Sequence, residues 1–270
     1  MVTPEQPIGM FDSGVGGLTV ARATIDLLPH EDLVYFGDTA RCPYGPRPEE
    51  EVRKFAFEIM DALVAEGVKM IVIACNAAAS SALPEARERY AVPLVSVIEP
   101  GVRAAVAATR NGRIGLIGTV RTVSSRSYDA AVAAQSSEVT LVSRACPEFV
   151  DYVERGDTAS EELLELARGY LEPLKKQGVD TLILGCTHYP LLTGIIQYVM
   201  GEEVVLVSSA EATATEIYAR LHDEGLLTRS TSPGSHRFIA TSEAGIFSEL
   251  GRRFIGTQFG DVEYRSWDKA

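Results

Sequence analysis

The sequence predicts an α/β protein built from two pseudo-symmetric, doubly wound domains with mainly parallel sheets. Two observations lead to this prediction. Short apolar segments rich in Val, Ile and Leu alternate with segments in which apolar residues recur at helical spacing, the pattern of parallel strands covered by helices. The series of apolar segments then occurs a second time further along the chain. With 270 residues, the chain is long enough for two separate cores.

The first series contains three predicted strands separated by two predicted helices. One helix begins near Leu18 and stops at Pro29, and the other begins after Pro48, ahead of three successive glutamates, and ends at Gly67. The predicted strands are IGMFDSG (8–14), DLVYFGD (32–38) and GVKMIVIACN (67–76).

The second series repeats the first at a nearly constant offset. Its strands are RIGLIGT (113–119), EVTLVSR (138–144) and GVDTLILGCT (178–187). The offset is 106 residues for the first two strands and 111 for the third, so that one five-residue insertion aligns them all. The matched pairs are Gly9 with Gly115, Gly67 with Gly178, Val68 with Val179 and Cys75 with Cys186. We interpret this pattern as a duplicated α/β unit.

The domain boundaries follow from this repeat. We expect a crossover near residues 98–101, where Pro100 interrupts the pattern, and a further helix from the capping-box pattern Ser208 to Glu211 through Leu221. The last strand, RFIATS, and the helix after it should pack back onto the first half. The predicted domains are therefore residues 1–98 plus 209–270, and residues 99–208.

Composition excludes several classes of protein. There are 37 acidic and 25 basic residues, and the net charge of −12 argues against nucleic acid as the main partner and against an anionic membrane surface. The N-terminus lacks the pattern of a signal peptide, and the longest apolar run, residues 70–75, is far too short to span a membrane. Four cysteines without a CxxC pair exclude a disulfide scaffold and a zinc ribbon. We therefore expect a cytoplasmic protein with reduced thiols.

Polar residues follow the predicted strands of both halves. In open parallel sheets ligands bind outside the carboxyl ends of the strands. These ends carry Asp12, Ser13, Asp38, Cys75 and Asn76 in the first half, and Cys186, Thr187 and His188 in the second. We expect the active site at the interface of the two domains.

If the two copies face each other, Cys75 and Cys186 lie on opposite walls of one pocket. They could then form a disulfide, share a metal ion, or act as acid/base groups on opposite faces of a bound molecule. Inversion of a carbon stereocentre by proton exchange requires a base on each face, and thiols with neighbours such as Asp12 and His188 can supply both. Cys42 and Cys146 have no such pairing and are expected to be structural.

Two loops are further candidates for binding. In FDSGVGGLTV, Asp12 and Ser13 precede three glycines and a helix start, where backbone amides can hold an anion, although the segment is neither a GxGxxG fingerprint nor a phosphate loop. In DTARCPYGPRP, Tyr44 and Gly45 could either cap the loop or reach over a cleft as a lid.

The motifs FDSGVGGLTV, GDTARCPYG, VIACNAAAS, CPEFVDYVERG and LGCTHYPLL resemble those of the glutamate racemases, cofactor-independent enzymes that supply D-glutamate for bacterial peptidoglycan. The resemblance runs from about residue 7 to residue 212. It implies that Cys75 deprotonates D-glutamate and Cys186 deprotonates L-glutamate. It also implies that Asp12, His188 and Glu154 support this acid/base chemistry.

The resemblance further implies the substrate contacts, no cofactor, no metal ion and a homodimer. The residues implied to bind glutamate are Asp12, Ser13, Tyr44, Gly45, Asn76, Ala77, Thr187 and His188. Ala77 departs from the family, in which most members have threonine or serine at this position. A side-chain hydroxyl contact is lost there unless the backbone amide or Ser80 compensates.

Three alternatives stay open at this point. The first is a racemase of another acidic amino acid, such as aspartate. The second is a zinc or redox protein that uses Cys75, Cys186 and His188 as ligands or as a disulfide. The third is a noncatalytic, two-lobed amino-acid-binding module.

Overall fold

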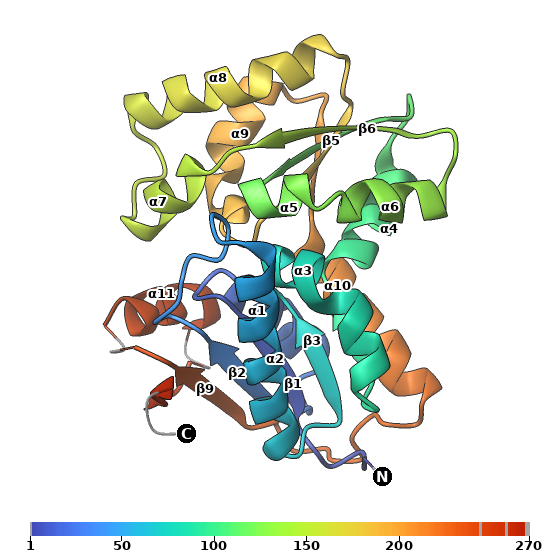
Figure 1. Ribbon diagram of the computed structural model, residues 1–270, viewed down its shortest axis with the longest axis vertical. Coiled ribbons are helices and arrows are strands. Elements are labelled where there is room, and N and C mark those ends of the chain that lie inside the picture. Colours follow the sequence, from blue (N-terminus) through green and yellow to red (C-terminus); the bar gives the residue numbers. More distant parts are fainter. Residues whose placement is uncertain (1, 243–244, 257–258, 268–270) are drawn as a thin grey trace. The chain divides into compact units, whose positions relative to one another are not determined.

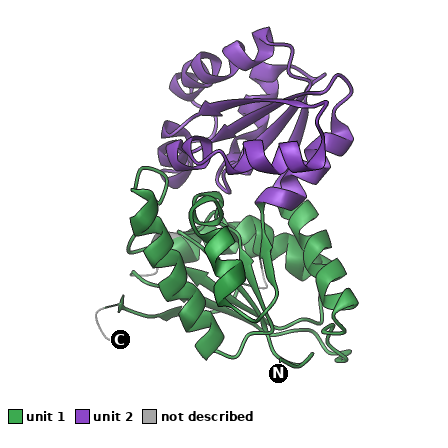
Figure 2. Cartoon of the chain, turned by 45° about the vertical axis from the view of Figure 1, so that its right-hand side comes forward, with its two compact units in different colours: residues 1–97, 210–270 green, residues 98–209 purple. Residues whose placement is uncertain are grey.

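The computed structural model describes residues 2–242, 245–256 and 259–267. The chain divides into two compact units, Met1–Val97 with Ala210–Ala270, and Ile98–Ser209 (Figure 2). Each unit contains one sheet, and every strand pair in both sheets is parallel. This confirms the predicted fold class. No helix among the described residues is both long and apolar enough to cross a bilayer.

The first unit holds a six-stranded sheet in the order β10-β9-β2-β1-β3-β4 (Figure 1). Its strands are β1 (Ile8–Asp12), β2 (Leu33–Gly37), β3 (Met70–Ile73), β4 (Leu94–Ser96), β9 (His236–Ala240) and β10 (Val262–Tyr264). Its helices are α1 (Leu18–Leu27), α2 (Glu49–Ala65), α3 (Asn76–Arg89), α10 (Ser209–Asp223) and α11 (Gly245–Ile255). Strands β9 and β10 extend the sheet beyond β2, so the C-terminal segment does pack onto the first half, as expected.

The second unit holds a four-stranded sheet in the order β6-β5-β7-β8. Its strands are β5 (Arg113–Gly118), β6 (Thr140–Ala145), β7 (Thr181–Gly185) and β8 (Val205–Ser208). Its helices are α4 (Ile98–Ala108), α5 (Val120–Ser124), α6 (Ser127–Gln135), α7 (Glu148–Glu154), α8 (Glu161–Lys176), the 3₁₀-helix η1 (Tyr189–Leu192) and α9 (Thr193–Met200).

The topology confirms the duplication. The order β6-β5-β7-β8 matches β2-β1-β3-β4, with β5, β6 and β7 in the places of their predicted counterparts. The fourth pair, β4 and β8, was not predicted. A Cβ on Gly9 would lie 2.9 Å from Val68, and a Cβ on Gly115 would lie 3.0 Å from Val179. Both units therefore use the same close contact between the central strand and the valine that precedes the third strand.

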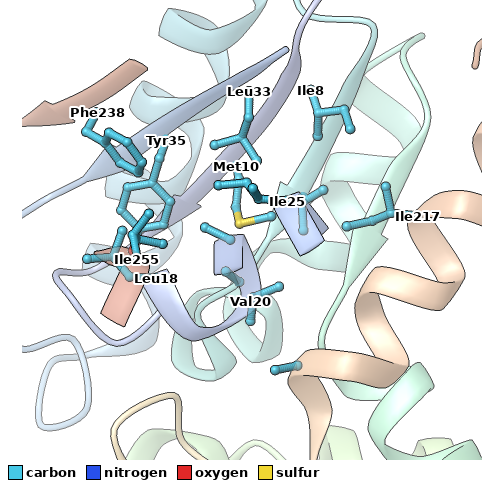
Figure 3. Close-up of a cluster of buried hydrophobic side chains, with 14 of the residues drawn as sticks. Ile8, Met10, Leu18, Val20, Ile25, Leu33, Tyr35, Ile217, Phe238 and Ile255 are labelled. Carbon is cyan, nitrogen blue, oxygen red and sulfur yellow. The ribbon is translucent and has the colours of Figure 1, made fainter. Parts of the chain in front are cut away.

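The core of the first unit explains why its strand sequences are continuously apolar. All residues of β1, β2 and β3 are buried, as expected for parallel strands covered on both faces. On one face, Met10 of β1, Tyr35 of β2 and Phe238 of β9 pack with Leu18 of α1 and Ile217 of α10 (Figure 3).

Helix boundaries follow the sequence signals in most places. Helix α2 begins directly after Pro48 with three glutamates in its first turn, and Gly67 with φ of 77° follows its end. The expectation that Pro100 interrupts the pattern is wrong, because α4 begins at Ile98 and includes Pro100. In the first turn of a helix the proline lacks only an N–H that would have no intrahelical partner.

The predicted strands were too long at their carboxyl ends. Strand β3 ends at Ile73 and β7 at Gly185, two residues and one residue before Cys75 and Cys186, respectively. Helix α3 begins at Asn76, because the Cys75 carbonyl already accepts a helical hydrogen bond from the Ala79 N–H at 2.8 Å. Cys75 is therefore the N-cap residue of a helix, rather than the end of a strand.

Candidate active site

Asp12 is the last residue of β1 and is fully buried. Its Oδ2 accepts hydrogen bonds from the backbone N–H of Gly17 at 3.0 Å and of Gly14 at 3.3 Å. Among the described residues no hydrogen-bond partner reaches its other oxygen, Oδ1. One side of this carboxylate is thus fixed by the glycine turn, and the other remains available for a ligand.

Close packing requires a glycine at position 17 of the FDSGVGGLTV segment. A Cβ on Gly17 would lie 2.6 Å from the Cβ of Asp12, 2.7 Å from the hydroxyl of Tyr35 and 3.1 Å from the Cβ of Ala74. The Tyr35 hydroxyl also donates to the carbonyl of Gly14 at 3.0 Å. Only a residue without a side chain lets the turn come close enough to hold Asp12 in place.

Cys75 lies beside this carboxylate. Its Sγ is 3.7 Å from the Oγ of Ser13, and the side chain is buried. Burial and the negative charge of Asp12 raise the pKa of the Cys75 thiol well above its ordinary value, while the backbone N–H groups of Ala78 and Ser13 and the Ser13 side chain act in the opposite direction. The raised pKa favours the thiol form of Cys75, and the backbone N–H groups of Ala78 and Ser13 lie within hydrogen-bonding reach of its sulfur.

The first turn of α3 places the residues after Cys75. Asn76 and Ala77 are its first two residues and are buried, and Ser80 lies one turn further along the helix. The backbone N–H of Ala77 belongs to the first turn, where helix geometry provides no intrahelical acceptor. Such an N-terminal turn can bind a carboxylate with main-chain groups alone.

The loop that carries Tyr44 and Gly45 is held by Asp38. Tyr44 is buried, and its hydroxyl donates a hydrogen bond to Oδ2 of Asp38. Burial and the neighbouring Asp38 carboxylate raise the pKa of Tyr44 above its ordinary value, so the phenol remains a donor. Of the two expected roles, the structure shows the cap: the Tyr44 ring closes the loop from inside.

In the second unit, Cys186, His188 and Glu154 lie in a row. The Sγ of Cys186 is 3.8 Å from Nδ1 of His188, and Nε2 of His188 is 3.6 Å from Oε1 of Glu154. Both Cys186 and His188 are buried, whereas the Glu154 side chain, at the end of α7, is 36% exposed. The row therefore leads from a buried thiol to a carboxylate in contact with solvent, as a proton path requires.

Thr187 lies between Cys186 and His188 and is also buried. The structure thus gathers all predicted residues of the second half at the carboxyl end of β7, together with the end of α7. In the first half it gathers Asp12, Ser13, Cys75 and Asn76 in the same way at β1 and β3. The loop of Tyr44 approaches this group through Cys42, whose Sγ is 3.1 Å from the position of a Cβ on Gly14.

Cys146 is in the same buried cluster as Cys186, but its thiol has different neighbours. It is fully buried among the apolar side chains of the second unit, and its Sγ faces the carbonyl of Arg144 at 3.7 Å. Burial raises the pKa of its thiol. These surroundings support the expectation that Cys146 is structural.

Thr119 is a candidate that the sequence analysis missed. It follows β5 directly, is buried, and caps α5 by accepting a hydrogen bond from the N–H of Thr122 at 3.3 Å. The signal was available, because the 106-residue offset of the repeat aligns Thr119 with Ser13. Each unit therefore has a hydroxyl side chain directly after its central strand, Ser13 after β1 and Thr119 after β5. Each central strand pairs with the strand that precedes the cysteine of its unit, β3 or β7.

The described residues contain no group of three or more His, Cys, Asp or Glu side chains placed to hold a metal ion. The site residues supply two thiols, each with its own hydrogen-bonding and acid/base neighbours.

Comparison with known proteins identifies the family of this chain. The model of the Asp/Glu/hydantoin racemase family matches residues 18–217. A glutamate racemase of Parafrankia sp. is 58% identical over 257 residues, which cover 95% of this chain and 93% of that protein. The chain belongs to the Asp/Glu/hydantoin racemase family. This membership confirms the resemblance first seen in the motifs.

Solved structures of glutamate racemases are similar to this chain over nearly its full length. The crystal structure of glutamate racemase from Bacillus anthracis has a TM-score of 0.92 at 41% identity and covers 98% of both chains. That of the Francisella tularensis glutamate racemase in complex with D-glutamate has the same TM-score at 32% identity, covering 99% of this chain and 100% of that one. The aspartate racemase of Picrophilus torridus, at 21% identity and a TM-score of 0.55, shares the fold alone.

Proposed function

We propose that this protein interconverts L-glutamate and D-glutamate by proton transfer at Cα, with Cys75 and Cys186 as the two proton-transferring groups and without a cofactor. The observation that carries the proposal is the repeated placement of a buried thiol after the third strand of each unit, beside Asp12 and Ser13 in one and His188 in the other. The names of the relatives at 56–58% identity support glutamate as the substrate.

In the direction from L to D, the Cys186 thiolate removes the Cα proton of L-glutamate from one face. The electron pair of the broken C–H bond stays on Cα and its carboxylate and takes a proton from the Cys75 thiol on the opposite face. Cys186 then holds the removed proton and Cys75 is a thiolate; the reverse reaction restores the first state. Between turnovers in one direction, Asp12 and the His188–Glu154 pair return the protons through solvent.

The protonation of Cys75 suits this cycle. Burial and Asp12 favour the thiol, which is the form that donates the proton. The N–H groups of Ala78 and Ser13 then stabilise the thiolate that donation leaves behind. The same residues therefore serve both protonation states without rearrangement.

Glutamate binding follows from the remaining polar groups. Oδ1 of Asp12 would accept a hydrogen bond from the substrate ammonium, and Ser13 would contribute its hydroxyl. Asn76, the backbone N–H of Ala77, Thr187 and His188 would donate to the carboxylates. Because the Tyr44 hydroxyl is bound to Asp38, Tyr44 and Gly45 would contribute main-chain groups.

The proposal includes a cellular setting. We propose a cytoplasmic enzyme that provides D-glutamate for peptidoglycan. The relatives that bear the name glutamate racemase support this setting. We also propose a homodimer, which size-exclusion chromatography with light scattering tests directly.

The test is α-proton exchange in deuterium oxide. We expect L-glutamate to become racemic with deuterium at Cα, and L-aspartate to react at least about a hundredfold more slowly. Faster turnover of L-aspartate than of L-glutamate would show that aspartate, rather than glutamate, is the substrate. Retained activity after treatment with a metal chelator is expected, and its loss would favour the zinc alternative.

Substitution of each thiol tests the two-base cycle. In Cys75→Ala, Cys186 should still exchange the Cα proton of L-glutamate without inverting it, and Cys186→Ala should do the same with D-glutamate. Full racemisation by either variant would refute the two-base mechanism. Glutamate binding by both variants, measured by calorimetry, should persist, and this separates lost chemistry from lost folding.

A further inference from the structure

Trp267 is the single tryptophan of the chain and lies close to its C-terminus. Its indole Nε1 donates a hydrogen bond to Oδ1 of Asp38 at 2.8 Å, although the two residues are 229 positions apart. Asp38 follows β2 and begins the loop that carries Tyr44 and Gly45. The contact therefore joins the end of the chain to a loop proposed to bind substrate.

Asp38 receives four side-chain donors and is fully buried. Oδ1 accepts from Trp267 and, at 2.9 Å, from the hydroxyl of Thr241. Oδ2 accepts from Nε of Arg41 at 2.6 Å and from the hydroxyl of Tyr44. Oδ1 thus binds the C-terminal segment and Oδ2 binds the loop, so that Asp38 connects the two segments.

Arg41 forms a second connection between the same parts. Its guanidinium lies between two aromatic rings, 4.0 Å from the ring centre of Phe55 and 4.1 Å from that of Trp267. Its NH1 group also pairs with Glu58 of α2. Trp267 covers one face of this cation, so that it fixes Arg41 by stacking and Asp38 by hydrogen bonding.

The segment before Trp267 is itself anchored to the sheet. Strand β10 pairs with β9, and the N–H of Arg265 donates to the carbonyl of Ala240 at 2.9 Å. The Arg265 guanidinium bonds Glu66 at 2.6 Å, and the Trp267 ring also lies 5.6 Å from that of Phe36 in β2. The indole is therefore held from the sheet side before it meets the loop.

We propose that Trp267 is a positioning residue for substrate binding, which acts through Asp38 and Arg41 on the turn that carries Tyr44 and Gly45. The inference rests on the proposed function, in which this turn supplies main-chain contacts to glutamate. Because Trp267 does not touch the thiols in this arrangement of contacts, its removal changes the affinity for glutamate and leaves the proton transfers at Cys75 and Cys186 largely unchanged.

The kinetic test compares Trp267→Ala, Trp267→Phe and a control, Tyr264→Ala, which removes an aromatic ring that is 60% exposed on β10. In Trp267→Ala we expect KM for both enantiomers to rise about tenfold or more, with kcat within about threefold. Trp267→Phe keeps a ring over Arg41 and loses the hydrogen bond to Asp38, so its KM should be intermediate. The control should match the unsubstituted enzyme, and an unchanged KM in Trp267→Ala would overturn the proposal.

Amide hydrogen exchange gives a readout that does not depend on the substrate. The amides of the non-proline residues between 41 and 47 should exchange faster in Trp267→Ala than in the unsubstituted protein, and those of β1 should be unaffected. Equal protection of residues 41–47 in both proteins would overturn the positioning role. If the unsubstituted protein fails to racemise glutamate, the proposed function fails, and the exchange comparison still decides the role of Trp267. Should Trp267→Ala fail to fold, Trp267→Phe carries the same comparison.

Discussion

The sulfur of Cys186 lies 3.8 Å from Nδ1 of His188, and the other ring nitrogen of that histidine faces Glu154 at 3.6 Å. The imidazole is thus interposed between a buried thiol and a carboxylate with access to water. In the proposed cycle it transfers the proton that Cys186 must gain or lose between turnovers. The first prediction follows from this position.

His188→Asn should lower kcat/KM by about 100- to 10,000-fold, the usual contribution of a positioned acid or base. Enantiomers have equal free energies, so kcat/KM must fall by the same factor in both directions. The affected half of the site therefore has to be identified from α-proton washout, which should slow more for L-glutamate than for D-glutamate. Equal slowing for the two enantiomers would contradict the assignment of His188 to Cys186.

Two variants serve as comparisons for His188→Asn. Glu154→Gln should slow the same half-reaction to a smaller extent, because its carboxylate is partly exposed and water can replace it. His222→Asn should have no effect on turnover, since the side chain of His222 is 65% exposed on α10.

Asp12 and Ser13 should shift the pKa of Cys75 in opposite directions. Asp12→Asn removes the negative charge that raises the pKa, so the thiolate should form at lower pH than in the unsubstituted protein. Ser13→Ala removes the hydroxyl whose hydrogen bond with the sulfur lowers the pKa of Cys75, so the thiolate should form at higher pH. The pH dependence of Cys75 alkylation, followed by mass spectrometry of its peptide, measures both shifts. Shifts in the same direction would show that Asp12 acts by geometry rather than charge.

Much of this half-site could be predicted from the sequence. Asp12, Ser13 and Cys75 each follow an apolar run, and parallel strands bring their carboxyl ends to one edge of a sheet. The role of Asp38 could not be predicted in this way. Two of its four donors, Arg41 and Tyr44, are close to it in sequence. The other two, Thr241 and Trp267, are more than 200 positions away, and no local pattern reveals such contacts.

Gly67 and Gly178 provide a stability test of the duplication. They occupy equivalent positions of the repeat and have φ values of 77° and 74°. A Cβ at either position would meet its nearest neighbour at 3.5 Å or more, so the cost of alanine comes from the backbone conformation. Gly67→Ala and Gly178→Ala should each lower the free energy of unfolding by about 1–2 kcal/mol, with kcat/KM unchanged.

Urea unfolding measures this effect, and Gly169→Ala is its control. Gly169 lies inside α8, where a Cβ would meet no described atom within 4 Å, and alanine should raise the free energy of unfolding by about 0.5–1 kcal/mol. A cost at only one of the two repeat positions would show that the loops, unlike the strands, have lost their equivalence.

Helix α3 shows a second limit of prediction from sequence. Its residues, NAAASSALPEARER, lack a clear apolar stripe, because small residues are buried around most of its circumference near the N-terminus. Periodicity therefore gave no signal, although alanine favours helix. As a consequence, the sequence pattern assigns Cys75 to the end of a strand, whereas the structure shows it at the N-cap of α3. The hydrogen bond from the N–H of Ala78, in the first turn of this helix, to the Cys75 sulfur could not be predicted from that pattern.

The raised pKa values of two buried thiols, Cys75 and Cys146, should make the stability of the protein depend on pH. Burial raises the pKa of Cys146 above its ordinary value of 9.0, and burial with Asp12 does the same for Cys75. As pH rises through 9, the unfolded chain loses these protons while the folded chain keeps them. Stability contributed by each protonated thiol is therefore full below this pH and declines above it, by up to about 1.4 kcal/mol per pH unit.

Cys146→Ala separates this effect from catalysis. The variant should show a shallower decline in the free energy of unfolding between about pH 8 and pH 10, on top of a pH-independent cost of about 1 kcal/mol for the small cavity. Its kcat/KM should stay within about twofold of the unsubstituted enzyme, since no step of the proposed cycle uses Cys146. Cys75→Ala should reduce the decline similarly but abolish racemisation. An unchanged decline in Cys146→Ala would mean that the Cys146 thiol ionises in the folded protein, and loss of activity would contradict the expectation that Cys146 is structural.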